Sequence, residues 1–158
     1  IQAGLTAVAA GTLMFVTSLF NGFGRIFWAS LSDRIGRRNV FLLITGTQVP
    51  LMLVLPKITS PLVFGAICCY ILLCYGGGFA TMPSFTADTF GPKYMGRIYG
   101  KILLAWSAAG VVGPMLMEFV KKRTDSFATA LTVASGLLVM GFILTLLYRK
   151  PQHKAEAA

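Results

Sequence analysis

The chain has 158 residues, of which 56% are hydrophobic and only 12% are charged, and its formal net charge is +9. A soluble domain carries about 25% charged residues because its surface must be covered with polar side chains. This composition excludes an ordinary soluble protein, and the long uncharged runs indicate helices that lie in lipid. The positive charges form short clusters between these runs, which indicates membrane topology and argues against nucleic-acid binding.

Five apolar runs are each long enough to cross a bilayer as a helix, which requires about 20 residues. We predict spans at about 5–30, 39–55, 61–83, 97–119 and 127–148. The second span is short and is followed by Pro56, and the first is interrupted only by Asn21 and Arg25. The predicted fold is therefore all-α and transmembrane, with residues 1–148 forming a partial bundle and residues 149–158 forming a tail.

The basic residues in the connections predict the orientation of the chain. Nine of them follow the first and third spans or lie in the tail: Arg34, Arg37, Arg38, Lys93, Arg97, Lys101, Arg149, Lys150 and Lys154. Four lie on the other side: Lys57, Lys121, Lys122 and Arg123. Because cytoplasmic loops carry an excess of Lys and Arg, we predict a multi-pass protein of the plasma or cytoplasmic membrane with a cytoplasmic C-terminus.

No catalytic or metal-binding pattern is evident in the sequence. Cys68, Cys69 and Cys74 lie in one apolar run and have no metal-ligand spacing with His153. There is no nucleophile elbow and no phosphate-binding loop. We therefore expect neither an enzyme nor a cofactor. The chain opens on Ile1 without a basic segment, so we also expect it to be a fragment of a longer protein.

The loop after the first span, residues 29–38, reads A-S-L-S-D-R-I-G-R-R. Asp33 can pair with a cation or accept from a helix N-terminus, and Gly36 permits a tight reversal. Arg37 and Arg38 would anchor the cytoplasmic face. By charge alone, an ordinary basic loop explains these residues equally well.

The spacing in this loop resembles the cytoplasmic motif of the major facilitator superfamily, Gly-x-x-x-Asp-Arg/Lys-x-Gly-Arg/Lys-Arg/Lys. It is matched by Asp33, Arg34, Gly36, Arg37 and Arg38, with Ala29 in place of the first Gly. In that superfamily the motif lies between helices 2 and 3 and again between helices 8 and 9. Since four spans follow, the resemblance implies helices 8 to 12 of a twelve-helix carrier, with the N-terminal half of the carrier as partner.

Two further segments resemble the oxalate/formate antiporter family and, more distantly, the monocarboxylate transporters. One is Asn21-Gly22-Phe23-Gly24-Arg25, and the other covers residues 76–114. The second contains a glycine run before Met82-Pro83, then Ala87-Asp88 with Phe90-Gly91, Gly96 with Tyr99-Gly100, and Gly113-Pro114. The resemblance implies a carrier of small carboxylates.

Arg25 lies eight residues before Asp33, about 12 Å along a helix, and therefore deep in the predicted membrane span. A cation at this depth costs about 2.5–3.5 kcal/mol and usually faces a cavity or a partner. The resembled family places a substrate-binding arginine here, and a guanidinium binds a carboxylate with two parallel hydrogen bonds. The alternative is an arginine that pairs with a carboxylate elsewhere in the carrier or reaches the membrane interface.

Asn21 lies one turn before Arg25 on the same helix face, where it can hold the guanidinium or form an ordinary interhelical hydrogen bond. The monocarboxylate transporters usually have an aspartate at this place. Because Asn21 cannot titrate, it favours anion exchange over proton symport.

Trp106 occupies the place where oxalate-carrying members have a second cation, which suits a monocarboxylate better. We expect Trp106 and Tyr99 to line the cavity, with ordinary packing or an interfacial position as the alternative. Gly76, Gly77 and Gly78 fall within the third span and predict either a hinge or close helix packing.

Together these observations predict secondary transport of small organic anions, such as formate, oxalate or another monocarboxylate, by antiport with alternating access. The expected partners are the carboxylate substrate, the lipid bilayer and the rest of the carrier. The alternatives are a major facilitator carrier of another substrate class, such as sugars, drugs or amino acids, and a membrane-embedded enzyme or assembly subunit.

Overall fold

The computed structural model describes residues 6–148 as five long helices and one short 3-10 turn. These are α1 (Ala7–Ile35), α2 (Arg37–Val54), η1 (Leu55–Lys57), α3 (Pro61–Phe90), α4 (Pro92–Thr124) and α5 (Phe127–Leu147). All five long helices have the length and apolar composition that crossing a membrane requires. The prediction of an all-α transmembrane bundle is confirmed, and the predicted tail lies outside the described residues.

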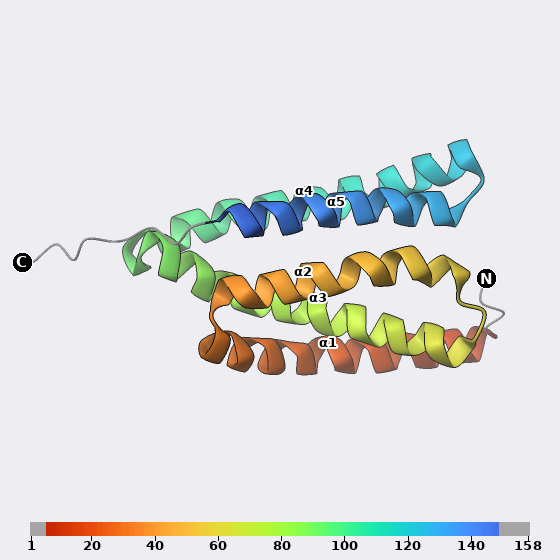
Figure 1. Cartoon of the computed structure of the whole chain (residues 1–158), viewed down its shortest axis with the longest axis horizontal. Coiled ribbons are helices and arrows are strands. Elements are labelled where there is room, and N and C mark those ends of the chain that lie inside the picture. Colours follow the sequence, from red (N-terminus) through yellow and green to blue (C-terminus); the bar gives the residue numbers. More distant parts are fainter. Residues whose placement is uncertain (1–5, 149–158) are drawn as a thin grey trace, which may run out of the picture.

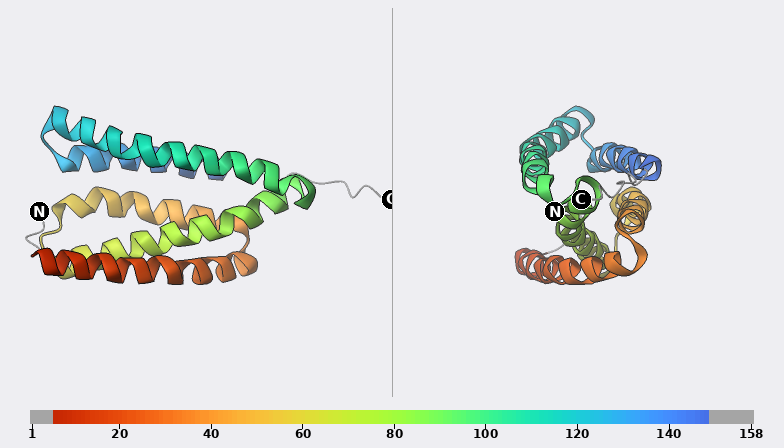
Figure 2. Two further views of the ribbon diagram at one scale, coloured as in Figure 1. Left: turned by 180° about the vertical axis from the view of Figure 1, so that it is seen from behind. Right: turned by 90° about the vertical axis from the view of Figure 1, so that its left-hand side faces the viewer.

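The five helices lie side by side along one long axis (Figure 1). The α1–α2 and α3–α4 connections lie at one end of the bundle, whereas the α2–α3 and α4–α5 connections lie at the other. We call the first the arginine end, because it carries Arg34, Arg37 and Arg38. Viewed end-on in Figure 2, α3 lies at the centre, with α1 below it, α4 on one side and α2 with α5 on the other.

Glycines bring α1 and α3 into close contact, which is the most extensive of the helix pairs. A Cβ atom on Gly24 would overlap the backbone of Leu73, and one on Gly76 would overlap the backbone oxygen of Asn21. A Cβ atom on Gly77 would overlap the ring of Trp28. Small residues allow membrane helices to approach this closely, so these glycines fix the distance between α1 and α3.

Three helices continue through an internal proline, and two of them, α3 and α4, extend well beyond the predicted spans. Helix α2 contains Pro50, α3 contains Pro83 and α4 contains Pro114. The third span was predicted to end at Pro83, but α3 continues to Phe90. A proline removes only one backbone hydrogen bond, and neighbouring helices compensate for this loss within a membrane. Composition predicts only the apolar part of a helix, and the polar turns at its ends are missed.

The buried core is small and lies where α1, α2 and α3 meet. It consists of Trp28, Val40, Ile44 and Cys74. Helix α4 has no buried residue at all. Large apolar side chains are exposed along all five helices, as expected for surfaces that contact lipid or other helices rather than water.

Candidate functional site

Arg25 lies near the middle of α1, ten residues before the end of that helix and therefore about 15 Å from it. Its guanidinium carbon lies 5.6 Å from the centre of the Phe79 ring of α3, a distance at which a cation is attracted to an aromatic face. Within residues 6–148, no acidic side chain forms an ion pair with Arg25. The guanidinium is thus supported by an aromatic ring and remains exposed.

Aromatic side chains connect this arginine to α4. The ring centres of Phe79 and Trp106 are 5.1 Å apart, and those of Trp106 and Tyr75 are 6.4 Å apart. Trp106 is 47% exposed, so it has surface available for a further contact. The structure therefore brings Arg25 and Trp106 into one cluster, built from α1, α3 and α4, which we call the Arg25 cluster.

Tyr99 lies seven residues before Trp106 on α4, which places it on the same helix face about 10 Å nearer the arginine end. It makes no described contact with Arg25. Tyr99 lines none of the cavities described below, so its predicted place beside the substrate stays a prediction.

Asn21 does not hold the Arg25 guanidinium by a hydrogen bond, which is one of the two roles that the sequence leaves open. Its Oδ1 atom is buried and accepts no hydrogen bond from the described residues. The reason is the close approach of Gly76, because this glycine packs directly against the backbone and side-chain oxygens of Asn21. Asn21 therefore belongs to the interface between α1 and α3 in this structure.

The three consecutive glycines of α3 have different surroundings. Gly76 and Gly77 are buried against α1, whereas a Cβ atom on Gly78 would meet nothing within 4 Å. Helix α3 is continuous through all three. Packing thus accounts for Gly76 and Gly77, and Gly78 alone has open space around it.

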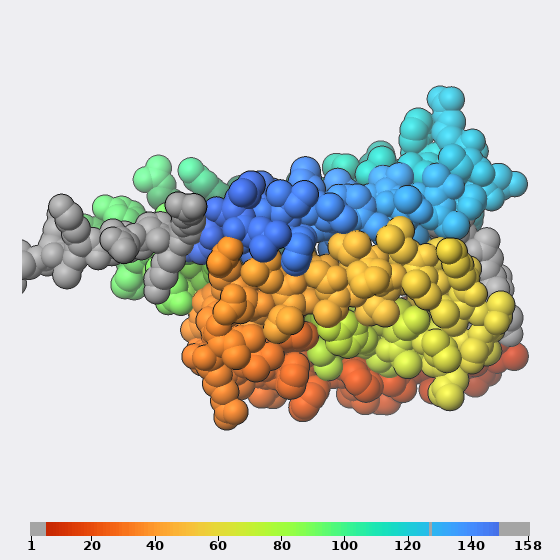
Figure 3. Space-filling view, viewed as in Figure 1, coloured from red at the N-terminus to blue at the C-terminus, as the bar shows by residue number. Residues whose placement is uncertain are grey.

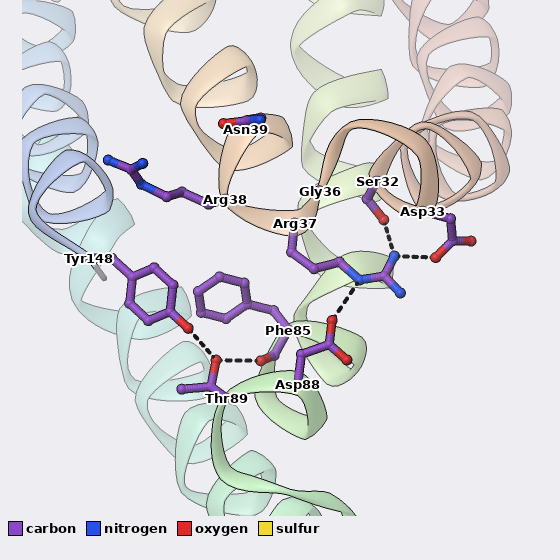
Figure 4. Close-up of a pocket in the computed structure, with 10 residues that line it drawn as sticks. All are labelled: Ser32, Asp33, Gly36, Arg37, Arg38, Asn39, Phe85, Asp88, Thr89 and Tyr148. Carbon is purple, nitrogen blue, oxygen red and sulfur yellow. Dashed lines mark hydrogen bonds and ion pairs between the residues drawn. The ribbon is translucent and has the colours of Figure 1, made fainter. Parts of the chain in front are cut away.

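The residues of the loop motif form an ion-pair network at the arginine end, shown in Figure 4. Arg37 Nη1 lies 2.5 Å from Asp33 Oδ1, and Arg37 Nε lies 3.3 Å from Asp88 Oδ2. Arg37 also donates to the Ser32 hydroxyl. This one guanidinium therefore joins the end of α1, the start of α2 and the end of α3.

The reversal between α1 and α2 depends on Gly36, whose φ is +91°. A residue with a side chain rarely adopts this conformation, so a glycine is needed at this position of the motif. Arg34 is exposed at the end of α1 and does not line the cavity beside the network.

Arg38 binds the end of α5. Its Nε donates to the Thr145 carbonyl at 3.2 Å and its Nη2 to the Leu146 carbonyl at 2.6 Å. The last carbonyls of a helix have no partner within the helix, so Arg38 satisfies two groups that would otherwise need water. Beside it, the hydroxyls of Thr89 and Tyr148 are 2.8 Å apart and line a polar cavity of about 440 Å³.

Comparison with protein families matches residues 2–158 to the Major Facilitator Superfamily. The chain belongs to this superfamily. It is similar to the oxalate:formate antiporter of Oxalobacter formigenes, with 32% identity over 111 residues that cover 67% of this chain and 27% of that protein. It is also similar to apicoplast pyruvate carrier 1 of Toxoplasma gondii, with 26% identity over 158 residues, or 95% and 28% of the two proteins. A third relative, monocarboxylate transporter 14 of Mus musculus, is 28% identical over 137 residues, or 85% and 26%.

The chain therefore spans between 26% and 28% of the length of these three superfamily relatives. Each of them is named as an antiporter, a carrier or a transporter, which agrees with the prediction that the chain is not an enzyme. Membership of the superfamily and five apolar helices together identify a multi-pass integral membrane protein. No group of three His, Cys, Asp or Glu side chains that could hold a metal occurs within residues 6–148.

Two residues of the Arg25 cluster were not indicated by the sequence. Phe79 and Tyr75 lie in a helix whose apolar residues surround it on all sides, so no periodic pattern marks the face that meets α1 and α4. Their spacing of four residues places them on one face, but it does not say which neighbour they meet. Asp88 was noticed as part of the resemblance, without its role as a partner of Arg37.

Proposed function

We propose that this superfamily member carries small organic carboxylates across a membrane by alternating access, with Arg25 binding the substrate carboxylate. The observation that carries the proposal is an arginine near mid-span that has aromatic neighbours and no acidic partner among residues 6–148. A cation in the membrane interior needs a compensating charge, and a carboxylate substrate supplies it.

The geometry of the guanidinium suits this role. Phe79 lies beside the guanidinium and holds it by a cation–π contact. Hydrogen bonding uses the N–H groups around the edge of the guanidinium, which none of the hydrogen bonds or ion pairs described above engages. Two parallel hydrogen bonds from this edge are the usual way in which arginine binds a carboxylate.

The substrate we favour has one carboxylate and a small apolar or planar body. The Arg25 cluster offers one cation together with the rings of Phe79 and Trp106. A second carboxylate would meet an aromatic ring rather than a second cation. The relatives named for pyruvate and for monocarboxylates support this substrate class. The oxalate:formate antiporter is named for a monocarboxylate and a dianion, so oxalate is the main comparison.

Exchange of two anions is the mode of transport that these residues support best. The acidic residues of the described chain, Asp33, Asp88, Glu118 and Asp125, lie in the connections or toward the ends of the helices. None is near Arg25, and Asn21 cannot take up a proton. Closing an empty site would leave Arg25 as an unpaired cation in the membrane interior, at a cost of about 2.5–3.5 kcal/mol. A loaded site pairs Arg25 with an anion and therefore reorients more readily.

The contacts between helices suggest which segments move together during alternating access. The glycine contacts make α1 and α3 move as one body, and Arg37 couples the ends of α1, α2 and α3 through Asp33 and Asp88. Gly78 is the position in α3 where bending meets no obstacle. We further propose that the arginine end is cytoplasmic and that the substrate site is completed by further helices of the carrier.

The test is counterflow in proteoliposomes of the full-length carrier with labelled formate, lactate and oxalate. We expect a monocarboxylate to exchange, Arg25→Gln to abolish exchange, and Arg25→Lys to retain a part of it. Arg123→Gln is the matched control, because Arg123 also lies over an aromatic ring but at the end of α4. If no carboxylate exchanges, or if Arg25→Gln exchanges normally, the carrier transports another substrate class and Arg25 has a structural role.

A further inference from the structure

A second cavity lies between α2 and α3, in the half of the bundle farther from the arginine end. Its volume is about 670 Å³, within the range of about 300–1,000 Å³ that is usual for ligand sites. It is an open groove lined by Thr47, Pro50, Leu51, Leu62, Val63, Ala66, Ile67 and Tyr70. Only two of these side chains are polar, so the groove suits an apolar occupant.

The two polar residues of the groove satisfy each other. The hydroxyls of Thr47 and Tyr70 are 2.8 Å apart and form a hydrogen bond between α2 and α3. The Thr47 hydroxyl also donates to the backbone of its own helix, to the Leu43 carbonyl at 2.6 Å. The groove therefore requires no hydrogen bond from its occupant, which excludes the transported anion as its ligand.

The length of the groove matches one leaflet of a bilayer. Along α3 it extends from the first turn, at Leu62, to Tyr70, and the helix begins at Pro61. The nine helical steps from Pro61 to Tyr70 span about 13.5 Å. This is close to half of the roughly 30 Å hydrocarbon thickness of a membrane. The pair of hydroxyls therefore lies near the mid-plane, where an acyl chain of that leaflet ends.

One cation, Lys57, lies in the connection between the two helices that form the groove. Lys57 is the only charged residue of the sequence between Arg38 and Asp88. It ends η1, in the short connection between α2 and α3, and its side chain is exposed. Leu51 and Leu62, which flank this connection, belong to the groove. Lys57 is therefore at the level of the lipid phosphates when the groove lies within the hydrocarbon.

We propose that this groove binds one glycerophospholipid, with an acyl chain along α3 from Leu62 to Tyr70 and its phosphate at Lys57. Leu62 is 83% exposed among residues 6–148, which leaves the groove open for an acyl chain to enter. Figure 3 shows part of α3 exposed between α2 and α1. The Arg25 cluster uses another face of α3, since Tyr75 and Phe79 contact Trp106 of α4 whereas Tyr70 contacts α2. The lipid and the transported anion therefore do not compete.

The occupant is a lipid rather than another helix for two reasons. A helix with side chains is about 10–12 Å wide and packs along its length, whereas this groove ends after one leaflet at a closed pair of hydroxyls. An apolar helix would also leave Lys57 without an anion, which a phospholipid provides.

Photolabelling of the full-length carrier in proteoliposomes tests this directly. The probe is phosphatidylglycerol with a diazirine near the end of one acyl chain, and the labelled peptides are identified by mass spectrometry. We expect the label near Tyr70 and Thr47. Ala66→Trp, which fills the groove, should lower this labelling at least about fivefold, while Ala128→Trp at an exposed position of α5 should leave it unchanged.

The role of the phosphate is tested by a variant that leaves the groove intact. Lys57→Gln should lower labelling about fivefold, which is what loss of roughly 1 kcal/mol of attraction gives. Lys122→Gln, at the same end of the bundle, should not lower it. A diacylglycerol probe with the same chain but no phosphate should label weakly and should not respond to Lys57→Gln.

Three results would overturn the proposal. One is equal labelling of the exposed faces of α4 and α5, and another is labelling that does not respond to Ala66→Trp or to Lys57→Gln. The third is a disulfide-linked dimer of a Val63→Cys variant that forms in the membrane and excludes the probe, because it would assign the groove to a second copy of the chain.

Discussion

Replacing Gly76 by alanine should force α1 and α3 apart. The new Cβ atom would overlap the backbone oxygen of Asn21, and a backbone atom cannot rotate away as a side chain can. Overpacking of this kind costs about 1–3 kcal/mol. Alanine favours a helix over glycine by about 0.8–1 kcal/mol, so we expect a net loss of up to about 2 kcal/mol, and a loss of about 1–3 kcal/mol relative to a glycine-to-alanine change without the overlap. Unfolding of the purified carrier by SDS in mixed micelles, followed by circular dichroism, measures this change.

The neighbouring position supplies the control. Gly78→Ala makes the same chemical change in the same helix, but its Cβ atom would meet nothing within 4 Å. It should be neutral or stabilise the carrier by up to about 1 kcal/mol. Unfolding free energies of the two variants that agree within about 0.5 kcal/mol would show that α1 and α3 are not held by these glycines. If Gly78→Ala slows counterflow without a loss of stability, Gly78 acts as a hinge.

Three further changes test the other clusters. Arg37→Gln removes two ion pairs whose aspartates are 64% and 48% exposed. The free energy of unfolding should therefore fall by only about 1 kcal/mol. A loss of more than about 3 kcal/mol would mean that the network is buried in the whole carrier. Phe79→Leu keeps an apolar side chain but removes a cation–π contact worth about 0.5–2 kcal/mol. The KM for the exchanged carboxylate should therefore rise about two- to thirtyfold. An unchanged KM would show that Phe79 does not contribute to substrate binding. Trp106→Lys adds a second cation beside Arg25 and should raise oxalate exchange relative to formate exchange; a ratio equal to that of the native protein would show that Trp106 does not select the anion.

The fold could be predicted from the sequence because each helix is an apolar run separated by charged connections. The predicted ends of the helices were less accurate, as α3 and α4 show. Helix α3 ends at Phe90 and α4 begins at Pro92, because Gly91 between them has a φ of +82°. From the sequence, only a gap between two apolar runs could be predicted, and not the residue at which the helices break. Hydrophobicity reports the boundary of the hydrocarbon, whereas a helix ends where its backbone geometry changes.

The candidate site was predictable in its polar part and not in its apolar part. Arg25 is conspicuous because a charge within an apolar run is expensive. Asp33 and Arg37 lie four residues apart and could be expected to pair, but nothing local indicates Asp88, which lies 51 residues after Arg37. Phe79 is one of many aromatic residues in a uniformly apolar helix. Its role depends on which helices surround it, and only the packed structure shows that.

The bond between Arg38 and the end of α5 has a consequence for the order of assembly. Arg38 is made early, and the carbonyls it binds follow 107 and 108 residues later. Membrane helices insert as they are synthesised, so the Arg38 guanidinium must remain solvated by water or lipid head groups while α3 and α4 enter the bilayer. The ends of α2 and α5 therefore become linked through this side chain only after α5 has been translated and inserted.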